Sequence, residues 1–146
     1  TELSQSIDAV YEEMVSDKVG DIWEMRNDYG RVVMGQSTPN DFIHEHVNGR
    51  LTSRDTVLLK NLLSAQHERL RMLSSDAWFF YDLDRIEPLN ALKYAAHATY
   101  LTKLACGRNV SEDLLPIISQ AHSQISGLHG DMAFLSYFSR FELNYA

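Results

Sequence analysis

The sequence predicts an all-α fold, an irregular bundle of about six to seven helices around two long central ones. First, residues 51 to 87 contain neither glycine nor proline, and their apolar side chains recur at spacings of three and four. Second, another long helical pattern runs from about residue 87 to residue 106. Third, no stretch of four or more residues alternates convincingly between polar and apolar side chains, as a half-buried strand would.

The N-terminal third predicts three short helices, over residues 3–17, 20–34 and 39–48. The first 28 residues are rich in carboxylates, as is typical of a solvated helix face. The third helix has a clear start signal, because Pro39 suits the first helical position after Thr38.

The first long helix is expected over residues 52–80. Thr52 and Asp55 at its start supply a hydroxyl and a carboxylate for backbone N–H groups that lack a partner within the helix. Its stripe comprises Leu58, Leu59, Leu62, Leu63, Gln66, Leu70, Leu73 and Ala77.

The second long helix is expected over residues 87–105, with Pro88 in its first turn and Gly107 after its end. Its stripe is rich in small residues, which permit close helix packing. Two further helices are expected over residues 111–125 and 130–143.

Composition favours one globular domain over residues 1–146. The chain has 45% hydrophobic residues, but its apolar runs fall far short of the roughly 20 residues that a membrane span needs. Its net charge of −7 disfavours nucleic acid as a partner. Because Cys106 is the only cysteine, no internal disulfide is possible, and we expect a cytoplasmic protein. The start at Thr1 suggests a piece of a longer polypeptide.

The most unusual feature is the aromatic and acidic cluster at residues 76–82, Asp-Ala-Trp-Phe-Phe-Tyr-Asp. Four consecutive aromatic side chains cannot share one helix face, so at least one must point away from the core. Flat rings beside carboxylates are suited to sugars, which stack on rings and donate hydroxyl hydrogen bonds. Alternatively, the aromatic side chains close the end of the bundle, while Asp82 and Asp84 cap the following helix.

Motifs for other chemistry are missing from the sequence. His44-Glu45-His46 has metal-ligand side chains, but residues i and i+2 diverge by about 200° on a helix. No phosphate-binding loop, dinucleotide-binding motif or nucleophile elbow is present. We therefore expect neither a metal nor a cofactor.

Several segments together resemble the helical region that follows the catalytic barrel in glycoside hydrolase family 57-like proteins. The similarity is greatest to an uncharacterised subgroup that carries a C-terminal domain of unknown function. The segments are Ile22 to Tyr29, Leu59 to His67, Ser74 to Leu83 with Ile86-Glu87, Leu92 to Ala96, Ser126 to Asp131 and Phe134 to Phe141. The most specific part is residues 78 to 87.

The resemblance implies an accessory helical domain that packs on a catalytic barrel and lines an α-glucan cleft. It implies no catalytic residue here, because the family's catalytic carboxylates belong to the barrel. The substrate-binding candidates are Trp78 and Asp76, with Phe79, Asp82 and Glu87 as supports.

Two other classes of function are alternatives. A protein interaction or self-association module requires only an exposed apolar patch. A standalone enzyme would use Asp76 and Asp82 as acid and base, with their pKa values pushed apart.

Overall fold

The computed structural model describes residues 1–73 and 82–145, and within these ranges the regular secondary structure is entirely α-helical. This confirms the predicted fold class. The helices are α1 (Glu2–Val15), α2 (Ile22–Asp28), α3 (Gly30–Val33), α4 (Pro39–His46), α5 (Ser53–Arg71), α6 (Ile86–Cys106), α7 (Leu115–Ile118) and α8 (Gly130–Tyr145).

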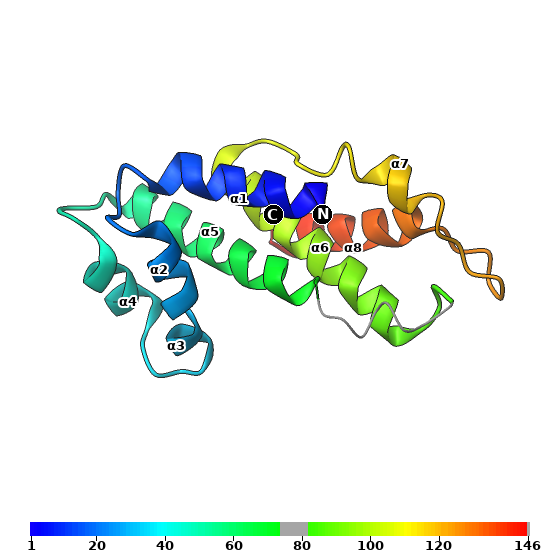
Figure 1. The fold of residues 1–146 in the computed structure, drawn as a ribbon, viewed down its shortest axis with the longest axis horizontal. Coiled ribbons are helices and arrows are strands. Elements are labelled where there is room, and N and C mark those ends of the chain that lie inside the picture. The colour runs from blue at the N-terminus through cyan, green and yellow to red at the C-terminus, as the bar shows by residue number, and fades with distance from the viewer. Residues whose placement is uncertain (74–81, 146) are drawn as a thin grey trace.

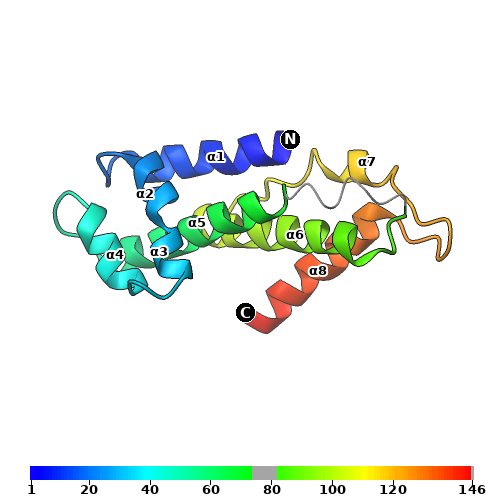
Figure 2. The ribbon, with the colours of Figure 1, turned by 60° about the horizontal axis from the view of Figure 1, so that its bottom comes forward.

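The two longest helices, α5 and α6, run antiparallel along the centre of an elongated molecule (Figure 1). Helix α1 lies along this pair, and α2, α3 and α4 gather beside the first half of α5. Helix α7 and the start of α8 lie at the opposite end, near the start of α6. Figure 2 shows α8 crossing α6 and carrying the C-terminus away from the bundle.

The core has two parts that share helices α1 and α5. One part lies between α1, α2, α4 and α5, where Tyr11, Met25 and Phe42 are completely buried. The other lies between α1, α5, α6 and α8, around Phe134 and several alanines. Helix α6 is buried on most sides at Ala95 to Thr102, so that it forms the centre of the second part.

The predicted helix boundaries are confirmed at three termini. The Thr38 hydroxyl accepts a hydrogen bond from the Asp41 N–H at the start of α4. Thr52 and Asp55 form a reciprocal capping box at the start of α5. Gly107 ends α6 with φ of 73°, a left-handed conformation that glycine adopts without a steric penalty.

The single helix predicted over residues 20–34 is wrong, because the chain forms α2 and α3 there. At Tyr29 the backbone N–H donates to Arg26 rather than to residue 25, which interrupts the α-helical pattern. The Tyr29 ring packs edge-on against Phe42, at a centroid distance of 5.7 Å. Tertiary packing against α4 therefore accompanies this break.

Two other predicted helices are shorter in the structure. Helix α5 ends at Arg71, with Met72 as its C-cap, and residues 74–80 of the predicted helix lie outside the described residues. In the segment predicted as a helix over residues 111–125, only Leu115–Ile118 is helical. Ser123 is one reason, since its hydroxyl oxygen accepts hydrogen bonds from the N–H groups of residues 125 and 126 and forms a turn instead.

In the described ranges, no helix combines the length and the apolar character that crossing a lipid bilayer would require.

Candidate functional site

The predicted substrate-binding residues divide into two groups. Asp76, Trp78 and Phe79 lie outside the residues that the structure describes. Asp82 and Glu87 lie inside, close to the start of α6. The structure therefore gives the surroundings of the last two alone.

Asp82 binds backbone N–H groups through both carboxylate oxygens. Oδ1 accepts from the Asp84 N–H at 3.0 Å, and Oδ2 accepts from the Gln124 N–H at 3.1 Å. The Asp84 N–H contributes most to lowering the pKa of Asp82 below its usual range, and the hydroxyl of Ser123 contributes next. Asp82 is thus held as a carboxylate by its own turn and by a loop distant in sequence.

Asp84 binds the same loop through two serine hydroxyls. The Ser123 hydroxyl donates to Oδ2 at 2.7 Å, and the Ser126 hydroxyl donates to Oδ1 at 2.8 Å. We call residues 82–84 the acidic turn and residues 123–126 the serine loop. The expectation that Asp82 and Asp84 cap the following helix is wrong, because Arg85 is the N-cap of α6 and no side chain caps it.

Glu87 lies in the first turn of α6 and is half-buried. The next residue, Pro88, lines a pocket of about 270 Å³ that we call the apolar pocket. Its lining is almost entirely apolar: Thr1, Leu3, Met72, Leu73, Leu83, Pro88, Ala91, Leu92, Ala95, Leu114, Ile118 and Ala121. Glu87 itself is not among the residues that line this pocket.

A second pocket, of about 290 Å³, lies between α5, α6 and α8 and has a different character. We call it the polar pocket. It is lined by Glu68, Arg71, Asn90, Lys93, Tyr94, His97 and Phe141.

Glu68 is the best-buried residue of the polar pocket lining, with an exposed fraction of 6%. Its Oε1 accepts a hydrogen bond from Arg71 at 2.9 Å, and its Oε2 lies 3.4 Å from Nδ1 of His97. Burial alone would raise the pKa of Glu68, but the contact with His97 and the charge of Arg71 outweigh burial and lower this pKa. The pocket thus contains a carboxylate fixed in its charged form.

Aromatic rings contact both partners of Glu68, Arg71 and His97. The Arg71 guanidinium lies over the Tyr94 ring, 3.9 Å from its centroid. The His97 ring stacks on Phe141, with a centroid distance of 4.4 Å and an interplanar angle of 12°. These contacts restrict the positions of both groups beside the hollow.

Sequence reasoning missed the polar pocket. Arg71 follows Glu68 by three residues, and His97 follows Tyr94 by three, so each pair shares a helix face. The pairing of α5 with α6 brings the two faces together. Two such pairs, one on each of the two long helices, are the sequence pattern that could have indicated this pocket.

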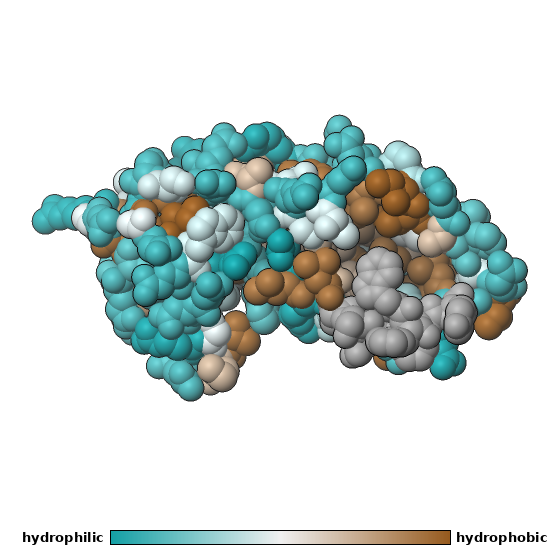
Figure 3. Space-filling view, in the orientation of Figure 1, coloured by the Kyte–Doolittle hydropathy of each residue, from teal (hydrophilic) through white to brown (hydrophobic). Residues whose placement is uncertain are grey.

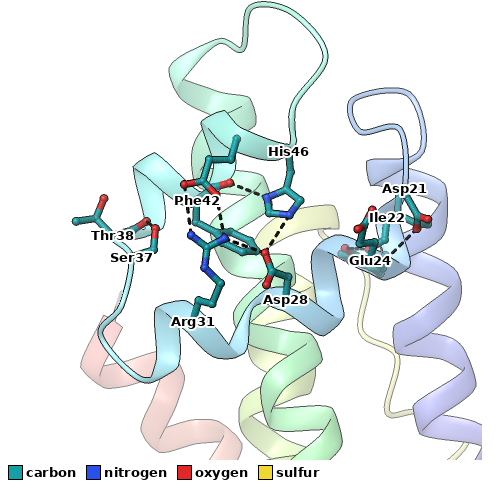
Figure 4. Close-up of polar contacts among 11 residues, drawn as sticks. Asp21, Ile22, Glu24, Asp28, Arg31, Ser37, Thr38, Phe42 and His46 are labelled. Atoms are coloured by element: carbon teal, nitrogen blue, oxygen red, sulfur yellow. Dashed lines mark hydrogen bonds and ion pairs between the residues drawn. The ribbon is translucent and has the colours of Figure 1, made fainter.

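A third polar cluster joins α2, α3 and α4 (Figure 4). Arg31 donates to Asp28 and to Glu45, each at 3.0 Å. His46 lies 3.3 Å from Asp28 through Nε2, and its Nδ1 lies 2.9 Å from the Phe42 carbonyl. Two residues of the His-Glu-His segment, Glu45 and His46, therefore take part in contacts between helices. Within residues 1–73 and 82–145, no three histidine, cysteine or acidic side chains converge on a possible metal position.

Comparison with protein families gives one result. The model of a family described as "Domain of unknown function (DUF3536)" matches residues 1–136. Neither curated proteins nor solved structures give a match. The family match agrees with the expected uncharacterised helical domain, and its description contains no reference to glycoside hydrolases.

Proposed function

The chain belongs to this family of domains of unknown function, and from that premise we propose that it is a non-catalytic accessory domain of a family 57-like, α-glucan-active protein. In this proposal it packs on the catalytic barrel of the parent polypeptide and lines part of an α-glucan cleft. The link to carbohydrate rests on the resemblance of residues 78 to 87 and of the helical segments around them.

The observation that carries the packing part of the proposal is an uncovered apolar surface at one end of the bundle. Ile125 is 83% exposed, Ile86 68% and Met132 57%. Ile86 begins α6, Met132 lies in the first turn of α8, and Ile125 lies in the serine loop between α7 and α8. Figure 3 shows hydrophobic surface gathered at this end, where the apolar pocket also lies.

Exposed apolar side chains in one region are typical of a surface that another protein or domain covers. The acidic turn and the serine loop fix the backbone beside this surface through four hydrogen bonds, those to Asp82 and Asp84. A surface supported in this way is shaped before a partner arrives, which reduces the entropy cost of docking.

The engaged oxygens of Asp82 support a non-catalytic role. An acid or base must reach the substrate, whereas both oxygens of Asp82 already accept backbone hydrogen bonds. Following the resemblance, we assign Trp78 and Asp76 to glucan contact, with Phe79, Asp82 and Glu87 as supports, and no catalytic residue to this chain.

The glucan part of the proposal can be tested with maltoheptaose. We expect maltoheptaose to change the tryptophan fluorescence of the wild-type chain and to have no effect on the Trp78→Phe variant. The second tryptophan, Trp23, packs against Tyr11 at a centroid distance of 5.4 Å and is the internal reference. An unchanged signal in the wild type, or the same change in both proteins, would contradict a role for Trp78.

Self-association is the second candidate, and the outer face of α8 favours it. Met132, Leu135 and Leu143 are all exposed on this helix. Sedimentation analysis of the isolated chain separates the two candidates. A concentration-dependent dimer that Leu135→Ser dissociates supports self-association, and a monomer supports packing on a separate domain.

A further inference from the structure

The polar pocket has a charge balance that differs from that of the whole chain. The chain carries a net charge of −7, whereas the pocket lining has one carboxylate, two permanent cations and an imidazole. Lys93 is exposed and takes part in none of the ion pairs of the described residues. Positive charge therefore remains beside this hollow after Glu68 has bound Arg71.

Arg71 also retains hydrogen-bonding capacity. A guanidinium has five N–H donors, and Glu68 accepts from NH1 of Arg71 at 2.9 Å. Asn90 adds an amide group to the same lining. The pocket thus combines spare donors with surplus positive charge, which is the chemistry that recognises carboxylate and phosphate groups.

The polar pocket is arranged before any ligand enters. Burying a carboxylate costs several kcal/mol unless it is paired, and here Glu68 is paired with both Arg71 and His97. Tyr94 and Phe141 each support one of these two partners with a ring face. Glu68 is therefore a positioning residue, because its carboxylate holds the Arg71 guanidinium in one orientation.

We propose that the polar pocket binds the oxyanion group, carboxylate or phosphate, of a small ligand. Lys93 and Arg71 supply the charge, and Asn90 supplies a further donor. A neutral sugar fits the lining less well, because Arg71 and His97 already cover one face of each aromatic ring. This site is separate from the apolar end on which the proposed packing depends.

The test measures backbone amide NMR shifts of the whole chain during titration with sodium phosphate and, separately, with sodium acetate. Sodium chloride at equal ionic strength is the reference, and maltotriose is the neutral probe. We expect one of the two oxyanions to shift the amides of residues 68–71 and 90–97 with saturation. The oxyanion that saturates at the lower concentration identifies the group.

The Lys93→Gln variant should weaken this binding by roughly tenfold, the usual effect of losing one charge-assisted hydrogen bond. Lys93→Arg should keep most of the affinity. The matched control is Lys60→Gln, which makes the same charge change on α5 at a position outside the pocket lining. Lys93 is exposed, so its variants should fold normally.

Three results would overturn the proposal. One is a response to phosphate and acetate that equals the response to chloride. Another is an equal loss of affinity in Lys93→Gln and Lys60→Gln, which would indicate attraction by overall charge. The last is a saturating response to maltotriose alone, which would assign a neutral sugar to the pocket.

Discussion

Glu68 and Asp82 both have a pKa below the ordinary range of a carboxyl group, and the physical reasons differ. Glu68 is buried, and its contacts with Arg71 and His97 keep it charged. Asp82 is only partly buried, and the N–H groups of Asp84 and Gln124 favour its charged form. The first carboxylate forms part of a pocket, whereas the second fastens one loop to another.

This difference shows that proximity to unusual residues is weak evidence for the role of a carboxylate. Asp82 adjoins the aromatic run in the sequence, yet its oxygens accept hydrogen bonds from the backbone of the acidic turn and of the serine loop. Glu68 lies in an ordinary amphipathic pattern, yet it is central to the polar pocket. The partners of a carboxylate, more than its neighbours in sequence, indicate what it does.

The largest expected effect on stability comes from the contact between α7 and the start of α8, beside the serine loop. A Cβ atom at Gly130 would lie 2.3 Å from the carbonyl oxygen of Ile118, because α7 meets the start of α8 there. We expect Gly130→Ala to lower the free energy of unfolding by about 3 kcal/mol, since backbone must move. Chemical denaturation measures this change.

The matched control is Gly30→Ala, at another helical glycine. A Cβ atom there meets nothing within 4 Å, so the variant should be neutral or slightly more stable. Equal losses in the two variants would show that the contact between Gly130 and Ile118 is not restrictive.

The next effect tests the paired state of Glu68. Glu68→Gln removes the charge that faces Arg71 and His97, and we expect a loss of about 2 kcal/mol. The same exchange at the exposed Glu112 should change the free energy of unfolding by less than about 0.5 kcal/mol. Urea denaturation of both variants checks this, and an unchanged stability of Glu68→Gln would mean that the pairing contributes nothing.

A smaller effect tests the attachment of the serine loop. Asp84→Ala removes the acceptor for the hydroxyls of Ser123 and Ser126, and we expect a loss of about 1 kcal/mol. Hydrogen exchange should accelerate at the Gln124 amide, because the loop then opens more often. Asp113→Ala, at an exposed position, is the control and should leave that amide protected.

The smallest expected effect is on the stability of the fold at acidic pH. Because the folded-state pKa of Glu68 is lowered, its stabilising contribution is present above the ordinary value of 4.5 and is lost as pH falls through the lowered value. Asp82 behaves in the same way around its ordinary value of 3.8.

Thermal unfolding from pH 6 down to pH 2 should therefore show stability falling with pH, and falling less steeply in Glu68→Gln. The contribution of Asp82 to this pH dependence should persist in the Glu68→Gln variant. Parallel curves for the wild type and Glu68→Gln would exclude a contribution of Glu68 to the acid dependence.

Local signals in the sequence were sufficient for much of the fold. The Thr52 and Asp55 pair marked the start of α5, and Gly107 marked the end of α6. The helix predicted over 111–125 failed in part because Ser123 forms a turn through its own hydroxyl, a local alternative that the helical pattern did not reveal. Of the predicted site, the structure describes Asp82 and Glu87, and the polar pocket was not predicted.

By itself, the sequence determined the all-α class, the two long helices, the cap at the start of α5 and the glycine end of α6. These depend on the spacing of apolar side chains and on hydrogen bonds between residues three or four positions apart. Only the tertiary structure decided that Glu68 meets His97, 29 residues away by their numbers, and that Asp84 binds Ser123. The reason is physical, because burial and pairing of charges depend on which helix faces meet, and helical periodicity does not specify the partner.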